Sequence, residues 1–90
     1  MEERSVSVRV TGRVQGVGFR AWTEERARAH RLSGWVRNEP SGSVAACFSG
    51  PAAAVEAMLA ELRAGPRLAR VDAVDVSAAE RPESGFRVRR

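Results

Sequence analysis

The sequence predicts a small α+β sandwich, in which two helices cover one face of a mostly antiparallel sheet. Segments with a strand-like repeat and segments with a helical repeat alternate in the order strand, helix, strand, strand, helix, strand, and a short strand follows. Each helix lies between two strands, so both connections should bring the helices to the same face of the sheet.

The first strand and the first helix are separated by a glycine-rich stretch. The three valines of residues 6–10 alternate with polar residues, which indicates a strand with one buried face. Residues 12–18 break this pattern. From Phe19 to about Arg31 the chain has no Gly or Pro and is rich in Ala, Glu and Arg, which favours a helix that Ser33-Gly34 should end.

The next two strands should form a hairpin. Trp35–Asn38 and Val44–Phe48 flank Glu39–Ser43, a segment whose Pro, Ser and Gly are typical of a hairpin turn. We therefore expect these two strands to pair in antiparallel orientation.

A second helix and two strands complete the chain. Gly50-Pro51 provides a helix start and Gly65-Pro66 a stop. Between them the apolar residues recur at helical spacing: Val55, Met58, Leu59 and Leu62. Residues 71–76 are predicted to form the fourth strand and residues 86–88 a short last one. Together the elements predict a ferredoxin-like sandwich, formed by residues 1–90 as a single domain.

The composition excludes several classes of protein. The chain is 43% hydrophobic and 29% charged, as expected for a globular domain. No stretch approaches the roughly 20 apolar residues of a membrane helix, and the first residues lack the pattern of a signal peptide, so we expect a cytoplasmic protein without a membrane partner. Cys47 and His30 are each the sole residue of their type, which argues against disulfides and zinc sites. We expect a buried thiol at Cys47, and neither a metal nor a cofactor.

The charge favours small anionic partners. The formal net charge is +4, and all 15 basic residues are Arg, a skew typical of codon bias. Apart from Arg89-Arg90 these residues are scattered and form no dense basic run, so nucleic acid is not the expected partner.

The glycine-rich loop has the features of an anion site. Residues 12–20 join a strand end to a helix start, where backbone N–H groups have no intrahelical partner. Gly16 and Gly18 allow a concave turn lined by these donors. Arg20, in the first turn of the helix, can present a planar fork of donors to phosphate oxygens. The loop and Arg20 together predict a phosphate cradle.

Two other interpretations of this loop must be considered. Taken alone, such a loop is more often only a tight connection, with Arg20 as a solvated surface charge. The pattern Gly16-x-Gly18-x-x-Ala21 also matches a dinucleotide-binding fingerprint, with Glu39 about 20 residues further on. The strand ending near Glu39, however, turns directly into a hairpin, and the chain is too short for a doubly wound sheet.

Two motifs resemble the acylphosphatase family. Residues 12–20, Gly-Arg-Val-Gln-Gly-Val-Gly-Phe-Arg, resemble its signature G-x-V-Q-G-V-x-F-R. Residues 34–44 resemble its second signature, G-x-V-x-N-x-x-D-G-x-V, at every fixed position except Ser41, where the family usually has Asp. The spacing of the later apolar residues is also similar to that of the family.

The resemblance implies a metal-independent hydrolase of acyl phosphates, with two catalytic side chains. Arg20 would bind the phosphate group, and Asn38 would hold the nucleophilic water. Backbone amides of one loop would complete the phosphate site: Gln15, Gly16, Val17, Gly18, Phe19 and Arg20. We accordingly expect inorganic phosphate or sulfate to bind in the loop, and we expect a monomer.

Two alternatives keep the same fold. The chain could be a non-catalytic module that binds acidic ligands or RNA, although it lacks the aromatic run typical of RNA-recognition modules. It could also resemble the accessory acylphosphatase domains of maturation proteins that handle carbamoyl phosphate. Because the given sequence ends with the domain, we expect a free-standing enzyme.

Overall fold

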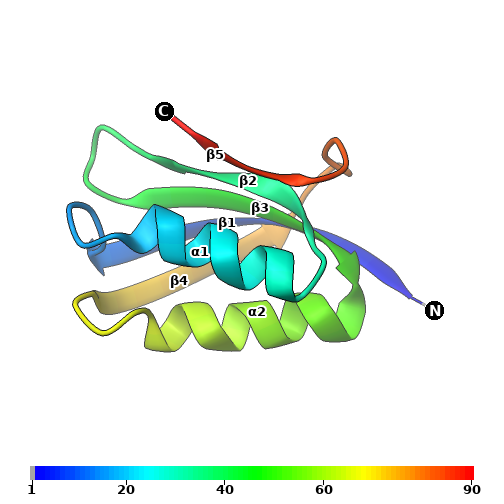
Figure 1. Cartoon of the computed structure of the whole chain (residues 1–90), viewed down its shortest axis with the longest axis horizontal. Coiled ribbons are helices and arrows are strands. Elements are labelled where there is room, and N and C mark those ends of the chain that lie inside the picture. The colour runs from blue at the N-terminus through cyan, green and yellow to red at the C-terminus, as the bar shows by residue number, and fades with distance from the viewer. Residues whose placement is uncertain (1) are drawn as a thin grey trace.

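The predicted sandwich is confirmed by a computed structural model that describes residues 2–90. Two helices lie side by side on one face of a five-stranded sheet (Figure 1). The elements in chain order are β1 (Glu3–Arg13), α1 (Phe19–Ala29), β2 (Ser33–Asn38), β3 (Val44–Pro51), α2 (Ala52–Ala64), β4 (Arg70–Ala78) and β5 (Phe86–Arg89). The strand order is β4-β1-β3-β2-β5, and every pair is antiparallel except β2 and β5, which are parallel.

The core lies between the sheet and the two helices. The valines of β1 that alternate with polar residues are buried, and so are the apolar residues of α2 at helical spacing. Both predicted patterns are therefore confirmed. The largest fully buried side chains come from the helices, the three strands β1, β2 and β3, and the loop after β1: Phe19, Phe48, Met58, Leu62, Val6, Val10, Val14, Val36, Val44 and Val55.

The end of α1 differs from the prediction. The helix ends at Ala29, and Ser33 and Gly34, the expected stop signal, already belong to β2. Arg31 takes a left-handed conformation with φ of 58°, and its N–H donates to the carbonyl of Arg28 at 3.0 Å. The N–H of Leu32 donates to the carbonyl of Ala27 at 2.9 Å. These are the two bonds of a Schellman motif, formed here with Arg at the position usually held by Gly.

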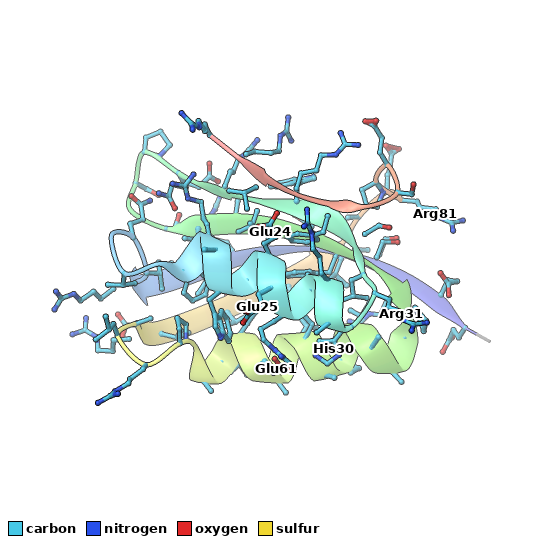
Figure 2. All side chains as sticks on the ribbon, in the orientation of Figure 1. Glu24, Glu25, His30, Arg31, Glu61 and Arg81 are labelled. Atoms are coloured by element: carbon cyan, nitrogen blue, oxygen red, sulfur yellow. The ribbon has the colours of Figure 1, made fainter. Side chains whose placement is uncertain are left out.

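A polar cluster joins the two helices. Glu61 of α2 faces His30 of α1 (Figure 2), with 2.5 Å from His30 Nε2 to Glu61 Oε2. Arg26 of α1 contacts the other carboxylate oxygen, with 2.6 Å from its Nε to Oε1. The hydrogen bond from Arg26 lowers the pKa of Glu61; burial opposes this effect, and the bond to His30 adds to it. The cluster therefore holds α2 against α1 through an ionised carboxylate.

Two further features bear on the sequence predictions: the burial of Cys47 and the length and apolar character of the helices. Cys47 is buried in β3, as predicted, and burial raises the pKa of its thiol, so the group is poorly suited to act as a nucleophile. Neither of the helices in residues 2–90 has the length and apolar character required to cross a membrane.

Candidate active site

The loop between β1 and α1 is anchored at both ends. Val14, which follows β1, and Phe19, which begins α1, are each at most 2% exposed. Between them, Gly16 and Gly18 have φ angles of 74° and 77°, in the left-handed region that favours glycine. Gly18 is also the N-cap residue of α1. The loop is thus a fixed concave turn that leads into the start of a helix.

Backbone donors at the start of α1 have no partner in the part of the chain that the structure describes. No side chain caps the helix, and its first turn contains no acidic residue. The first helical N–H with an acceptor is that of Trp22, which donates to the carbonyl of Gly18 at 3.1 Å. Within residues 2–90, the N–H groups of residues 15–21 donate to no backbone carbonyl. A Cβ built on Gly16 or Gly18 would have no atom within 4 Å, so the loop faces open space.

Free N–H groups at a helix N-terminus attract anions. The helix dipole contributes a partial positive charge at the same place. Arg20, partly exposed in the first turn of α1, adds a full positive charge. Its Nη1 donates to the main-chain carbonyl of Arg89 at 3.1 Å, which orients the guanidinium and leaves its other N–H groups for a ligand.

Asn38 lies at the end of β2, opposite Val44 of β3. The structure brings this residue and Arg20 to one open cleft of about 770 Å³. The residues that line the cleft come from the loop, α1, the end of β2 and the C-terminal segment: Val14, Gly16, Gly18, Phe19, Arg20, Ala21, Asn38, Val88 and Arg90. Two sequence-distant side chains with complementary predicted roles thus share one concave surface.

Two predicted loop residues do not line this cleft. The side chain of Gln15 turns instead to the β2–β3 hairpin, where its Nε2 donates to the carbonyls of Glu39 and Ser43 at 2.8 Å each. Val17 packs, partly buried, against the core. These residues can therefore contact a ligand in the cleft only through their backbone N–H groups.

The sequence did not reveal the contribution of the C-terminal segment. Val88 and Arg90 line the cleft because β5 pairs in parallel with β2, with Arg89 opposite Arg37. No local signal in a four-residue strand specifies its partner or its direction. The C-terminal strand could be predicted, but not its place beside the site.

A smaller cavity of about 300 Å³ lies on the opposite face of the sheet. Its charged side chains neutralise one another, because Glu39 lies 3.4 Å from Arg9 and 3.6 Å from Arg37. Trp35 fills part of this face, with the guanidinium carbons of Arg37 and Arg89 at 4.9 and 5.3 Å from its ring centre. Since its cations are already paired, this cavity is a weaker candidate for binding an anion.

Comparison with known proteins agrees with this geometry. The acylphosphatase family model matches residues 6–88. An acylphosphatase from Salinibacter ruber is 51% identical over 90 residues, covering 98% of this chain and 95% of the relative. Among solved structures, an acylphosphatase from Coxiella burnetii superposes with a TM-score of 0.92 at 34% identity, covering 97% of this chain and 93% of that one. One from Bacillus subtilis gives 0.91 at 28% identity, covering 99% and 100%.

Proposed function

Because the chain belongs to the acylphosphatase family and hydrolyses acyl phosphates, we propose that Arg20 and the loop amides hold the phosphoryl group while Asn38 orients the attacking water. The observation that carries this proposal is that Arg20, Asn38 and the unpaired N–H groups at the start of α1 border a single cleft. A phosphate in this position would receive hydrogen bonds from both main chain and guanidinium.

Phosphate binding is the role of Arg20 and of residues 15–20. The amides donate to the non-bridging oxygens, and the guanidinium balances their negative charge with a planar pair of N–H groups. Because these donors are fixed by the fold before substrate arrives, little reorganisation is needed as charge shifts in the transition state. The loop can equally accept free inorganic phosphate or sulfate.

Positioning of water is the role of Asn38. Its side-chain carbonyl can accept a hydrogen bond from a water molecule and hold the water oxygen in line with the phosphorus–oxygen bond that breaks. The water oxygen forms a new bond to phosphorus, the carboxylate departs with the electron pair of the old bond, and a phosphate oxygen takes the proton released by the water. The products are a carboxylate and inorganic phosphate.

The leaving group explains why this small set of residues suffices. A carboxylate has a conjugate acid with a pKa of about 4, so it departs without being protonated. Among the described residues, the cleft lining contains no Asp, Glu, His or Cys that could act as a general acid. What remains for the protein is orientation and charge stabilisation, which the loop, Arg20 and Asn38 can supply.

The proposal also covers the metal requirement, the partners and the oligomeric state of the enzyme. The cleft presents N–H donors and a guanidinium, which bind anions and not metal ions, and residues 2–90 contain no group of three His, Cys, Asp or Glu side chains arranged to bind a metal. We therefore propose a metal-independent enzyme without a nucleic-acid or membrane partner. The exposed large apolar side chains of residues 2–90, Leu68 and Val88, offer little area for a stable dimer, which supports a monomer. A single domain over residues 1–90 and a cytoplasmic location belong to the same proposal.

The roles of Arg20 and Asn38 can be distinguished by measuring phosphate binding and turnover in the same variants. Arg20→Ala should weaken binding of inorganic phosphate and abolish turnover, and Arg20→Lys should recover little, because a point charge does not reproduce the planar fork. Asn38→Ala should keep phosphate affinity and lose turnover by roughly 10²-fold or more. Circular dichroism should show that all three variants fold. If calorimetry found equal losses of phosphate affinity in Arg20→Ala and Asn38→Ala, Asn38 would be a phosphate ligand.

A further inference from the structure

We propose that Gln15 is a positioning residue, which fixes the phosphate-binding loop relative to Asn38. Gln15 belongs to the loop after β1, whereas Asn38 is the last residue before the β2–β3 hairpin turn. The carboxamide of Gln15 reaches across to that turn and donates to the carbonyl oxygens of Glu39 and Ser43, both at 2.8 Å. This inference rests on the water-orienting role proposed for Asn38.

The chemistry of the contact determines which way the carboxamide faces. Both partners are carbonyl oxygens, which can only accept, so the nitrogen of Gln15 must face them and both of its hydrogens are used. The same two carbonyls also accept bonds within the turn: Glu39 N–H donates to Ser43 at 2.9 Å, and Gly42 N–H donates to Glu39 at 3.0 Å. Gln15 is thus part of the hydrogen-bond network that shapes the turn.

Strand pairing in the sheet does not fix the loop after β1 relative to the β2–β3 turn. The pairing of β1 with β3 and that of β2 with β3 both stop at Val44, which lies opposite Val10 on one side and Asn38 on the other. Beyond this row, the loop of residues 14–18 and the turn of residues 39–43 project past the ladders between these strands. The contact is partly buried and joins residues 24 and 28 positions apart in the chain. It therefore ties two turns that carry different parts of the proposed site.

The expected consequence is a loss of turnover without a loss of phosphate binding. The backbone donors and Arg20 would remain in place without the Gln15 carboxamide, so phosphate affinity should change little. The distance from the bound phosphate to the water held by Asn38 would no longer be fixed. Misplacement by about 1 Å can cost roughly 10²-fold in rate, so we expect kcat to fall by roughly 10- to 100-fold, with the dissociation constant for inorganic phosphate changed by less than about twofold.

Gln15→Met tests this expectation, because Met has a similar length and cannot donate either hydrogen bond. Gln15→Glu is a second variant of the same shape, whose carboxylate would be repelled by the two carbonyls and should lower kcat at least as far. Ser41→Ala is the matched control: it removes a hydrogen bond of the same turn, between the hydroxyls of Ser41 and Ser43, and leaves the Gln15 contacts intact. This control should keep wild-type kcat. Circular dichroism, and phosphate binding by calorimetry, establish that each variant is folded with an intact cradle.

A double variant that combines Gln15→Met with Asn38→Ala shows whether Gln15 acts through Asn38. If it does, Gln15→Met should lower kcat in the wild-type background and cause no further loss in the Asn38→Ala background. Wild-type kcat in both Gln15 variants, or a full additional loss in the double variant, would overturn the inference. Weakened phosphate binding in folded Gln15 variants would overturn it too, since Gln15 would then support the cradle itself. Wild-type turnover in Asn38→Ala alone would instead reject the role proposed for Asn38.

Discussion

Arg20 and Arg89 are joined by a hydrogen bond that spans 69 positions of the chain: Nη1 of the Arg20 guanidinium donates to the main-chain carbonyl oxygen of Arg89, 3.1 Å away. The acceptor belongs to the backbone of β5, which is held in place by its parallel pairing with β2. The orientation of the proposed phosphate-binding side chain therefore depends on the last strand of the sheet, and not on the identity of the side chain at position 89.

Truncation of the chain after Val88 should leave the guanidinium of Arg20 without a fixed orientation. The shortened chain loses the carbonyl that orients the guanidinium, so we expect several-fold weaker phosphate binding and lower turnover in a protein that still folds. Arg89→Ala and Arg90→Ala are the controls for lost charge, because each keeps the backbone of Arg89, and both should retain most of the activity. Calorimetry with inorganic phosphate and steady-state kinetics measure the two effects. Equal losses in the truncation and in Arg89→Ala would assign the effect to the side chain.

Substrate preference should follow the leaving group. Acyl phosphates should be hydrolysed in excess chelator, whereas alkyl phosphate monoesters should react orders of magnitude more slowly, because an alkoxide needs an acid that the cleft lining lacks. Parallel assays with one substrate of each class, with and without chelator, check both points. Comparable rates for the two classes would reveal a missing acid, and activity restored by a divalent metal would refute the metal-free mechanism.

Ser41→Asp, which introduces the usual family residue, should change turnover by less than about threefold and stability by less than about 0.5 kcal/mol. Ser41 is exposed in the hairpin turn, does not line the cleft, and bonds through Oγ to the hydroxyl of Ser43 at 2.8 Å. An Asp carboxylate can accept the same bond. Kinetics and thermal unfolding provide the measurement, and a rate change of orders of magnitude would show that this turn shapes the active site directly.

Glu61→Gln should lower Tm at neutral pH, and the difference from wild type should shrink in acid. The pKa of Glu61 is lowered in the folded protein, chiefly by the hydrogen bond from Arg26. Stability from this group is therefore fully present above its unfolded pKa, about 4.3, and is lost as the pH falls through its lower folded pKa. Thermal unfolding from pH 7 to pH 3 tests this. Glu56→Gln, on the exposed side of the same helix, should have little effect on Tm at neutral pH. A constant Glu61→Gln difference across that range would show that packing, not charge, is responsible.

Arg31→Gly should stabilise the protein by about 0.5–1 kcal/mol. Arg31 has a φ of 58°, which costs a side-chain-bearing residue energy that glycine avoids. The expected rise in Tm is a few degrees for a domain of this size. Arg67→Gly removes the same charge from an exposed turn residue without positive φ, and should lower Tm slightly. A rise in both variants would attribute the gain to reduced positive charge.

Much of the fold could be predicted because its signals are local. The alternating valines of β1 and the apolar repeat of α2 each identify an element and its buried face. The first helix was harder to delimit, since its buried residues, Phe19, Thr23 and Ala27, include a polar and a small side chain. Its end was predicted wrongly because Arg31 adopts the conformation for which glycine is the usual signal.

The candidate site was predictable only in part, because only some of its features have a local signal in the sequence. The loop and Arg20 are contiguous, so the prediction of an anion site follows from residues 12–20 alone. Asn38 was singled out only through the resemblance of its motif, because its approach to Arg20 depends on the packing of separate strands. The contacts of Gln15 with the hairpin and of Arg20 with Arg89 depend on that packing as well, and no spacing in the sequence reveals them.

The N–H groups of residues 15–21, which find no acceptor among residues 2–90, belong to the main chain, and this gives the proposed phosphate cradle an unusual genetic property. Among single substitutions only a change to proline removes such a donor, and proline fixes φ at about −65°, which the left-handed backbone at Gly16 and Gly18 cannot adopt. A conventional alanine scan would therefore detect Arg20 and the two glycines with positive φ, and would miss most of the donors proposed to contact phosphate. Replacing single amide linkages by esters through chemical synthesis would expose them one at a time. In the proposed site, a change of side chain at loop positions other than Arg20 and the two glycines can accordingly leave these donors in place.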